Sequence, residues 1–115
     1  MNVFAGILGY ESLWLGACGW VAVASNLLPG PCAKIYEAAV ERADRDSALA
    51  IYHQILPVVR AVGGPFFVAA SKAGLSMMGL DVGQPRAPRL PLTDDLQHKL
   101  HDALGKLAVL NPFPH

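Results

Sequence analysis

The pattern of apolar and polar positions predicts two short strands near the start of the chain. The segment from Gly16 to Asn26 is a continuous apolar run, opened by two glycines and closed by a Ser-Asn pair. Such a run is typical of a strand buried on both faces of a parallel sheet, and we expect the strand itself over 20–24. A shorter strand is expected at 2–5, before Gly6. A parallel strand with so few neighbours is incomplete, which indicates that the chain is the end of something larger.

Helical spacing of apolar residues predicts four helices after these strands. The first begins near Pro31, and the acidic segment 44–46 ends it and can cap the next. The second contains Pro57, which should kink the helix or strain its hydrogen bonding. The third, 66–78, is apolar nearly all round and is expected to be buried among other helices. The fourth follows the N-cap Thr93, and the last three helices are expected to pack as a small antiparallel bundle.

Three further segments complete this pattern. A brief helix is expected at 12–15, between the two strands. The prolines of 81–91 indicate an extended connector before the last helix. The end of the chain, 111–115, is expected to be a frayed tail.

Composition adds that the chain is unusually apolar. It has 115 residues, which allows one domain, with 53% hydrophobic and 16% charged residues and a mean hydropathy of +0.35. This fits either a well-packed α/β domain or a chain whose apolar faces meet another segment. Nine basic and nine acidic residues balance, and no basic run is present, so nucleic acid is not an expected partner.

Membrane insertion is also not expected. The apolar heart of the uncharged segment, 13–24, is shorter than the ~20 residues that a spanning helix needs, and the N-terminus lacks the basic region of a signal peptide. The two cysteines, Cys18 and Cys32, have no CxxC spacing and lie in apolar surroundings. A reducing, cytoplasmic location is therefore predicted.

The last helix carries the residue types of a metal site. His98 and His101 lie at helical neighbour spacings from Asp94 and Asp102. No second cluster completes a coordination sphere, so a solvated helix face is the favoured interpretation and no metal is predicted.

Three other groups of residues could carry chemistry, and each has a simpler structural explanation. Lys72 stands in the most apolar helix, where desolvation could make it a Schiff-base amine, but a lysine that reaches the surface or pairs with a carboxylate is favoured. His53 could form a thiol–imidazole pair with Cys18 or Cys32, although no spacing supports it. Ser25-Asn26 closes the apolar run, where side chains line the sites of parallel α/β folds, and simple capping of the loop is the alternative.

Five segments, taken in order, resemble the dihydrodipicolinate synthase / N-acetylneuraminate lyase family. The run from Gly16 to Asn26, with the Leu-Leu-Pro and Tyr-Glu-Ala-Ala that follow, resembles its last barrel strand and helix. The remaining matches are the Ile55-Leu-Pro57 break, the Phe67-Val-Ala-Ala-Ser-Lys72 helix, its Gly79-Leu80 end, and the Gly83–Leu92 connector. Together they cover nearly the whole chain.

This resemblance implies an α/β fold, the C-terminal fragment of a (β/α)8 TIM barrel that is mostly helical by content. Residues 1–43 would be the end of the barrel, with its last two strands, and 44–115 a helical extension. The family consists of lyases and aldolases that form a Schiff base between a lysine and a 2-oxo acid, usually pyruvate. The lysine and the proton-relaying tyrosine belong to the sixth and fifth strands, which this sequence does not match, so no catalytic residue is predicted here.

The same resemblance implies two substrate contacts, Gly6 at the end of one strand and the backbone carbonyl of Val21 on the next. No cofactor is expected. The chain is predicted to be inactive alone, and its expected partners are a complementary barrel fragment or a second copy, with the 2-oxo acid bound only in a complete barrel. The alternative is a non-catalytic helical module for interaction or assembly.

Overall fold

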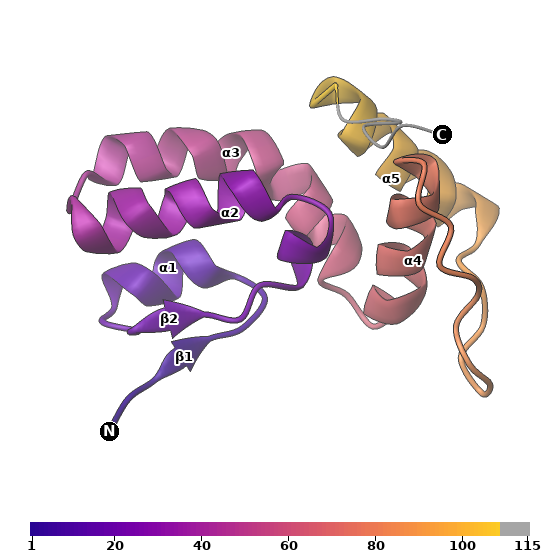
Figure 1. The fold of residues 1–115 in the computed structure, drawn as a ribbon, viewed down its shortest axis with the longest axis horizontal. Helices are drawn as coiled ribbons and strands as arrows, with labels where there is room; N and C mark the ends of the chain where they lie inside the picture. Colours follow the sequence, from indigo (N-terminus) through magenta and orange to yellow (C-terminus); the bar gives the residue numbers. More distant parts are fainter. Residues whose placement is uncertain (109–115) are drawn as a thin grey trace.

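The computed structural model describes residues 1–108, which are mostly helical (Figure 1). The elements in chain order are β1 (Phe4–Ala5), α1 (Gly9–Trp14), β2 (Gly19–Trp20), the 3-10 helix η1 (Val23–Asn26), α2 (Pro29–Tyr36), the π-helix η2 (Glu37–Glu41), α3 (Arg45–Val62), α4 (Phe67–Met77) and α5 (Asp94–Lys106). The tail expected at 111–115 lies outside the described residues.

Two parallel strands form the sheet of the described chain. Phe4 pairs with Gly19, and Ala5 pairs with Trp20. Helix α1 connects the strands, which makes β1–α1–β2 a βαβ unit, and it begins earlier than the expected 12–15. Figure 1 shows the helices above β2 and the N-terminal residues of the described chain below β1. Successive side chains of a strand point to opposite faces, and Ala5 is buried whereas Phe4 is 62% exposed. The sheet is therefore covered on one face only.

The predicted strand 20–24 is wrong in length and in burial. β2 ends at Trp20, and the side chain of Val21 is 71% exposed. The chain turns into η1, where Ser25 Oγ donates a hydrogen bond to the carbonyl of Ala22 at 2.6 Å and Asn26 Nδ2 donates one to Val23 at 3.0 Å. Both hydrogen bonds join a side chain to a backbone carbonyl three residues earlier. Short polar side chains such as serine and asparagine favour turns over strands because they can form such local bonds.

The helix boundaries follow local signals closely. Asp44 is the N-cap of α3 and accepts a hydrogen bond from the backbone N–H of Ser47 at 3.2 Å. Thr93 is the N-cap of α5, as predicted. α2 begins at Pro29, two residues before Pro31, and α3 continues through Pro57 to its end. The capping residues therefore mark these helix starts as the sequence indicates.

The third predicted helix is less buried than expected. Phe66 is 55% exposed and Phe67 39%, both at the start of α4, whereas Ala69 and Ala70 are buried. The chain bends by 120° between α3 and α4. α3, α4 and α5 do contact one another, but α3 and α4 are splayed rather than closely antiparallel. The bend leaves the first turn of α4 uncovered.

A single apolar core joins the helices. Its largest fully buried side chains come from α2, α3 and α5, and include Ile35, Ile55, Val58, Leu100 and Leu104. No charged residue of the described chain is buried, and the hydroxyl-bearing residues of the core are Tyr10 and Tyr52. The helical part can therefore bury its apolar stripes without help from the sheet.

Within residues 1–108, no single helix has the length and apolar character to cross a membrane. α3 and α4 pass the length and composition test only when taken together, across their bend.

Candidate functional site

Gly6 and Val21 lie side by side, immediately after the paired residues of the two strands. Ala5 pairs with Trp20, so the next residues of the parallel register are Gly6 and Val21. The backbone N–H of Val21 donates a hydrogen bond to the carbonyl of Ala5 at 2.9 Å, which continues the pairing. Both residues are therefore at the carboxyl ends of neighbouring parallel strands, where α/β folds bind ligands.

Trp20 holds these two strand ends together. Its indole Nε1–H donates a hydrogen bond to the carbonyl oxygen of Gly6 at 2.6 Å. Its ring lies so close to Gly9 at the start of α1 that a Cβ there would overlap it, whereas a Cβ at Gly6 would meet no atom within 4 Å. Trp20 is therefore a positioning residue for the strand ends, a role that the sequence pattern did not indicate.

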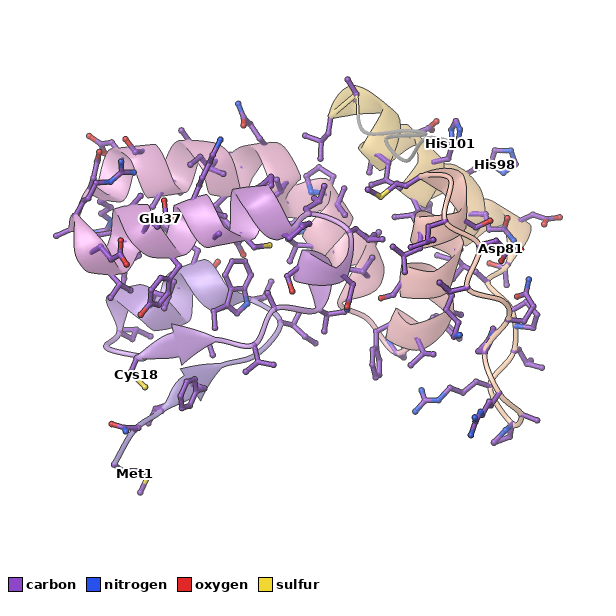
Figure 2. All side chains as sticks on the ribbon, viewed as in Figure 1. Met1, Cys18, Glu37, Asp81, His98 and His101 are labelled. Atoms are coloured by element: carbon purple, nitrogen blue, oxygen red, sulfur yellow. The ribbon has the colours of Figure 1, made fainter. Side chains whose placement is uncertain are left out.

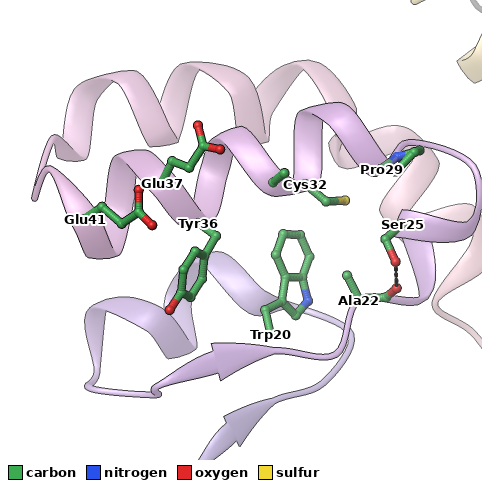
Figure 3. A pocket seen from close by; sticks show the side chains of 9 residues that line it. Trp20, Ala22, Ser25, Pro29, Cys32, Tyr36, Glu37 and Glu41 are labelled. Atoms are coloured by element: carbon green, nitrogen blue, oxygen red, sulfur yellow. Dashed lines mark hydrogen bonds between the residues drawn. The ribbon is translucent and has the colours of Figure 1, made fainter.

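A groove lies beside Trp20, between β2 and the side of α2 (Figure 3). Its volume is about 390 Å³, and its lining includes Ser25, Cys32, Tyr36, Glu37 and Glu41. Burial raises the pKa of the Cys32 thiol to about 11, so the thiolate needed for nucleophilic attack is disfavoured. No described hydrogen bond joins Cys32 or Cys18 to His53. The thiol–imidazole pair, which no spacing in the sequence supports, therefore gains no support from the described residues either.

A buried aromatic contact, missed by the sequence, links α1 to α3. The hydroxyl of Tyr52 donates to the Glu11 carboxylate, with both oxygens at 3.2 Å. Its ring stacks on Tyr10, with centroids 5.0 Å apart. Burial, together with the charge of Glu11 and this hydrogen bond, raises the pKa of Tyr52 to about 12. The tyrosine is therefore held neutral as a hydrogen-bond donor.

Lys72 is a half-buried residue of α4 that reaches the connector. Its Nζ donates a hydrogen bond to the carbonyl oxygen of Val82 at 3.2 Å. The favoured interpretation expected a lysine that reaches the surface or pairs with a carboxylate; this contact is at an exposed position, and its acceptor is a backbone carbonyl. This contact ties the connector to α4 and is remote from the strand ends.

The two histidines of α5 point outward, away from the other helices (Figure 2). A ring nitrogen of His98 lies 2.8 Å from the backbone carbonyl of Asp94, which is a local contact within the helix. In residues 1–108 no group of three or more His, Cys, Asp or Glu side chains is arranged to hold a metal ion. His101 and Asp102 are exposed on the same helix.

Known proteins share the sequence pattern and the fold of this chain. The profile of the Dihydrodipicolinate synthetase family matches residues 4–107. The 4-hydroxy-tetrahydrodipicolinate synthase of Lacticaseibacillus casei is 36% identical over 91 residues, which cover 79% of this chain and 30% of that enzyme. The chain therefore spans less than a third of the length of this relative.

Solved structures agree in fold. Dihydrodipicolinate synthase from Aquifex aeolicus matches with a TM-score of 0.87 and 23% identity, over 96% of this chain and 38% of that one. The enzyme from Acinetobacter baumannii, solved in complex with pyruvate, matches with a TM-score of 0.86, 23% identity and the same coverage. These neighbours have the TIM-barrel fold of lyases and aldolases. From the profile match over nearly its whole length, the chain belongs to the dihydrodipicolinate synthetase family.

Proposed function

We propose that this chain is the C-terminal part of a (β/α)8 lyase or aldolase that acts on pyruvate or another 2-oxo acid through a lysine Schiff base. In this proposal, residues 1–43 complete the barrel and 44–115 form a helical extension. The chain contributes Gly6 and Val21 as substrate contacts and is inactive alone. The observation that carries the proposal is the juxtaposition of these two residues at the ends of parallel strands in a family of this type.

The uncovered sheet supports a barrel partner. Each strand has one neighbour in the described chain, so each has an outer edge without a strand partner. Val3, Phe4 and Val21 are exposed apolar residues on or beside these strands. Parallel sheets are normally covered on both faces, and an open apolar edge invites pairing. We therefore propose a complementary barrel fragment as partner, with a second copy of the chain as the alternative.

The chemistry requires an amine and a proton relay near the strand ends. The lysines of this sequence are all on helices α2, α4 and α5: Lys34, Lys72, Lys99 and Lys106. The tyrosines also lie on helices: Tyr10, Tyr36 and Tyr52. The catalytic lysine and tyrosine are therefore expected on the complementary fragment. We also propose a cytoplasmic location, which suits the two unpaired cysteines.

Borohydride trapping tests this proposal. A lysine amine adds to the 2-oxo carbon and expels water to give an imine, which borohydride reduces to a stable secondary amine. With pyruvate, the isolated chain is expected to gain no mass. Mixed with the first two thirds of the Lacticaseibacillus casei enzyme, it should restore an adduct on a lysine of that fragment. An adduct on Lys72 of the isolated chain would contradict the proposal.

A non-catalytic assembly module is the second candidate, and the continuous core of α2, α3 and α5 favours it. This alternative predicts a cooperative thermal transition and a defined oligomer for the chain alone. Calorimetry and analytical ultracentrifugation measure both. An aggregating chain without a cooperative transition would support a fragment that needs its barrel partner.

A further inference from the structure

A second exposed apolar surface lies away from the strands, where α3 bends into α4. Figure 1 shows α4 and α5 at the end of the molecule remote from β1 and β2. Two grooves meet there at Pro65 and Phe66. One, of about 490 Å³, lies between the end of α3, the start of α4 and α5; the other, of about 280 Å³, lies between α4 and the connector. We call the residues that line both grooves the corner surface.

The corner surface combines exposed apolar side chains with positive charge. Phe66 lines both grooves, and Leu90 of the connector, which is exposed, lines one of them. The ionisable residues that line the two grooves are Arg60, Lys99 and Arg89, all of them cations. The complementary occupant is therefore an apolar segment with negative charge.

The three cations of the corner surface differ in the contacts that they already make within the chain. Lys99 Nζ lies 3.3 Å from a carboxylate oxygen of Asp95, one turn away on α5. The guanidinium of Arg89 lies over the ring of Phe67, 5.4 Å from its centroid. No ion pair joins Arg60 or Arg89 to another residue within 1–108. Both guanidinium groups can therefore donate hydrogen bonds to carboxylates of another molecule.

We propose that the corner surface binds an amphipathic, acidic helix of a partner protein. A groove between helices accepts the apolar side of such a helix, read at positions i, i+3, i+4 and i+7. Aromatic and arginine side chains are the residue types that most often carry interface energy. Phe66 would be the apolar anchor, and Arg60 and Arg89 would pair with acidic residues on either side of it. This proposal is independent of the barrel chemistry.

The test uses the whole chain and a fluorescein-labelled helical peptide of about 16 residues. The peptide has leucines at i, i+4 and i+7 and glutamates beside them; a twin has lysine for every glutamate. Fluorescence anisotropy is expected to show saturable binding of the acidic peptide, weakened by salt. Phe66→Ala and Arg60→Glu should each weaken it by about tenfold or more.

Controls separate a docking site from general electrostatics. Lys34→Glu removes a last-turn cation of α2 that lines neither groove, and it should leave binding nearly unchanged. Arg89→Glu, in the connector outside the helices, repeats the charge test if Arg60→Glu fails to fold by circular dichroism. Pyruvate trapping in the reconstituted barrel should be unaffected by Arg89→Glu.

Three results would overturn the proposal. The first is equal binding of the lysine twin, and the second is no saturable binding at about 1 mM peptide, the limit of weak affinity. The third is self-association of the wild-type chain that Arg60→Glu abolishes while the peptide does not bind, which would assign the corner surface to a second copy.

Discussion

Leucine and valine side chains beside the strands β1 and β2 (the strand end) differ in exposure from those in the core of α3 and α5 (the helical end). Leu15, beside the strands, is 89% exposed, whereas Leu104 of α5 is fully buried. Val21 after β2 is open to solvent, and Val58 of α3 is not. Residue type therefore does not decide burial here; the presence of a covering element does. The core faces of α2, α3 and α5 cover one another, whereas within residues 1–108 the two strands lack the neighbours that a parallel sheet needs.

This contrast indicates that the two ends have different sources of stability. The helical end is stabilised by its own core, because its apolar stripes meet within the chain. The strand end joins this core through Ala5, Tyr10 and Leu13 and adds specific contacts, such as the indole–carbonyl bond of Trp20 to Gly6. Its exposed apolar side chains contribute stability only when a partner covers them. The predictions below test this division.

The largest expected effect comes from a matched pair of leucines. Leu104→Ala leaves a cavity in the core and should lower the free energy of unfolding by about 2–5 kcal/mol. Leu15→Ala removes a side chain that buries almost nothing and should change it by less than about 0.5 kcal/mol. Urea unfolding, followed by circular dichroism at 222 nm, measures both. Equal losses would show that the two ends do not differ as described.

The next effect tests how the strand end is held. Gly9→Ala places a Cβ against the ring of Trp20, so the ring must move and the hydrogen bond to Gly6 should weaken. We expect a loss of about 1–3 kcal/mol, as for other overpacking substitutions. The indole N–H resonance of Trp20 should shift in two-dimensional NMR spectra.

Gly30→Ala is the matched control for this substitution. A Cβ at Gly30 meets no atom within 4 Å, and the residue lies in the first turn of α2. Alanine is a better helix former than glycine, and the crowding of its Cβ by the ring of the following Pro31 opposes this gain, so the unfolding free energy should change by less than about 1 kcal/mol. An unchanged Trp20 resonance in Gly9→Ala would refute the close contact.

The sequence predicted the helices better than the strands, and the reason is physical. A cap such as Asp44 or Thr93 acts on its own first turn, so the signal and its effect are neighbours in the chain. The burial of a strand depends on segments far away or outside the chain. The apolar run after Trp20 therefore appeared to be a longer strand, although Ser25 and Asn26 turn it into η1.

The candidate site was predictable only in part. Gly6 and Val21 were chosen through family resemblance, and their role as substrate contacts stays a prediction. That they are neighbours depends on the strand register, which the spacing of residues along the chain does not determine. The bond from Trp20 to Gly6 and the contact of Tyr52 with Glu11 are likewise tertiary, and no local pattern indicates them.

A smaller effect is expected where the two ends meet. Tyr52→Phe removes the hydroxyl that joins α3 to Glu11 of α1 and should cost about 1–2 kcal/mol. The pKa of Tyr52 is raised, so its contribution is present below the unfolded value of about 10 and is lost as the pH rises through about 12. Tyr36→Phe, whose hydroxyl donates to the carbonyl of Cys18 at 3.3 Å, is the control. Equal losses of unfolding free energy for the two variants, measured in urea, would contradict a specific role of Tyr52 in linking α3 to α1.

The smallest effect concerns the cap between the two ends. Hydrogen bonds from the side chain and backbone of Ser47 lower the pKa of Asp44. A lowered pKa means that the cap stabilises the fold above the unfolded pKa of about 3.9 and that this contribution is lost as the pH falls through the folded value. Asp44→Asn should therefore make the stability fall less steeply as the pH is lowered, measured as the urea midpoint between neutral and acid pH. A fall that is identical in wild type and Asp44→Asn would show that the helical end does not depend on this cap.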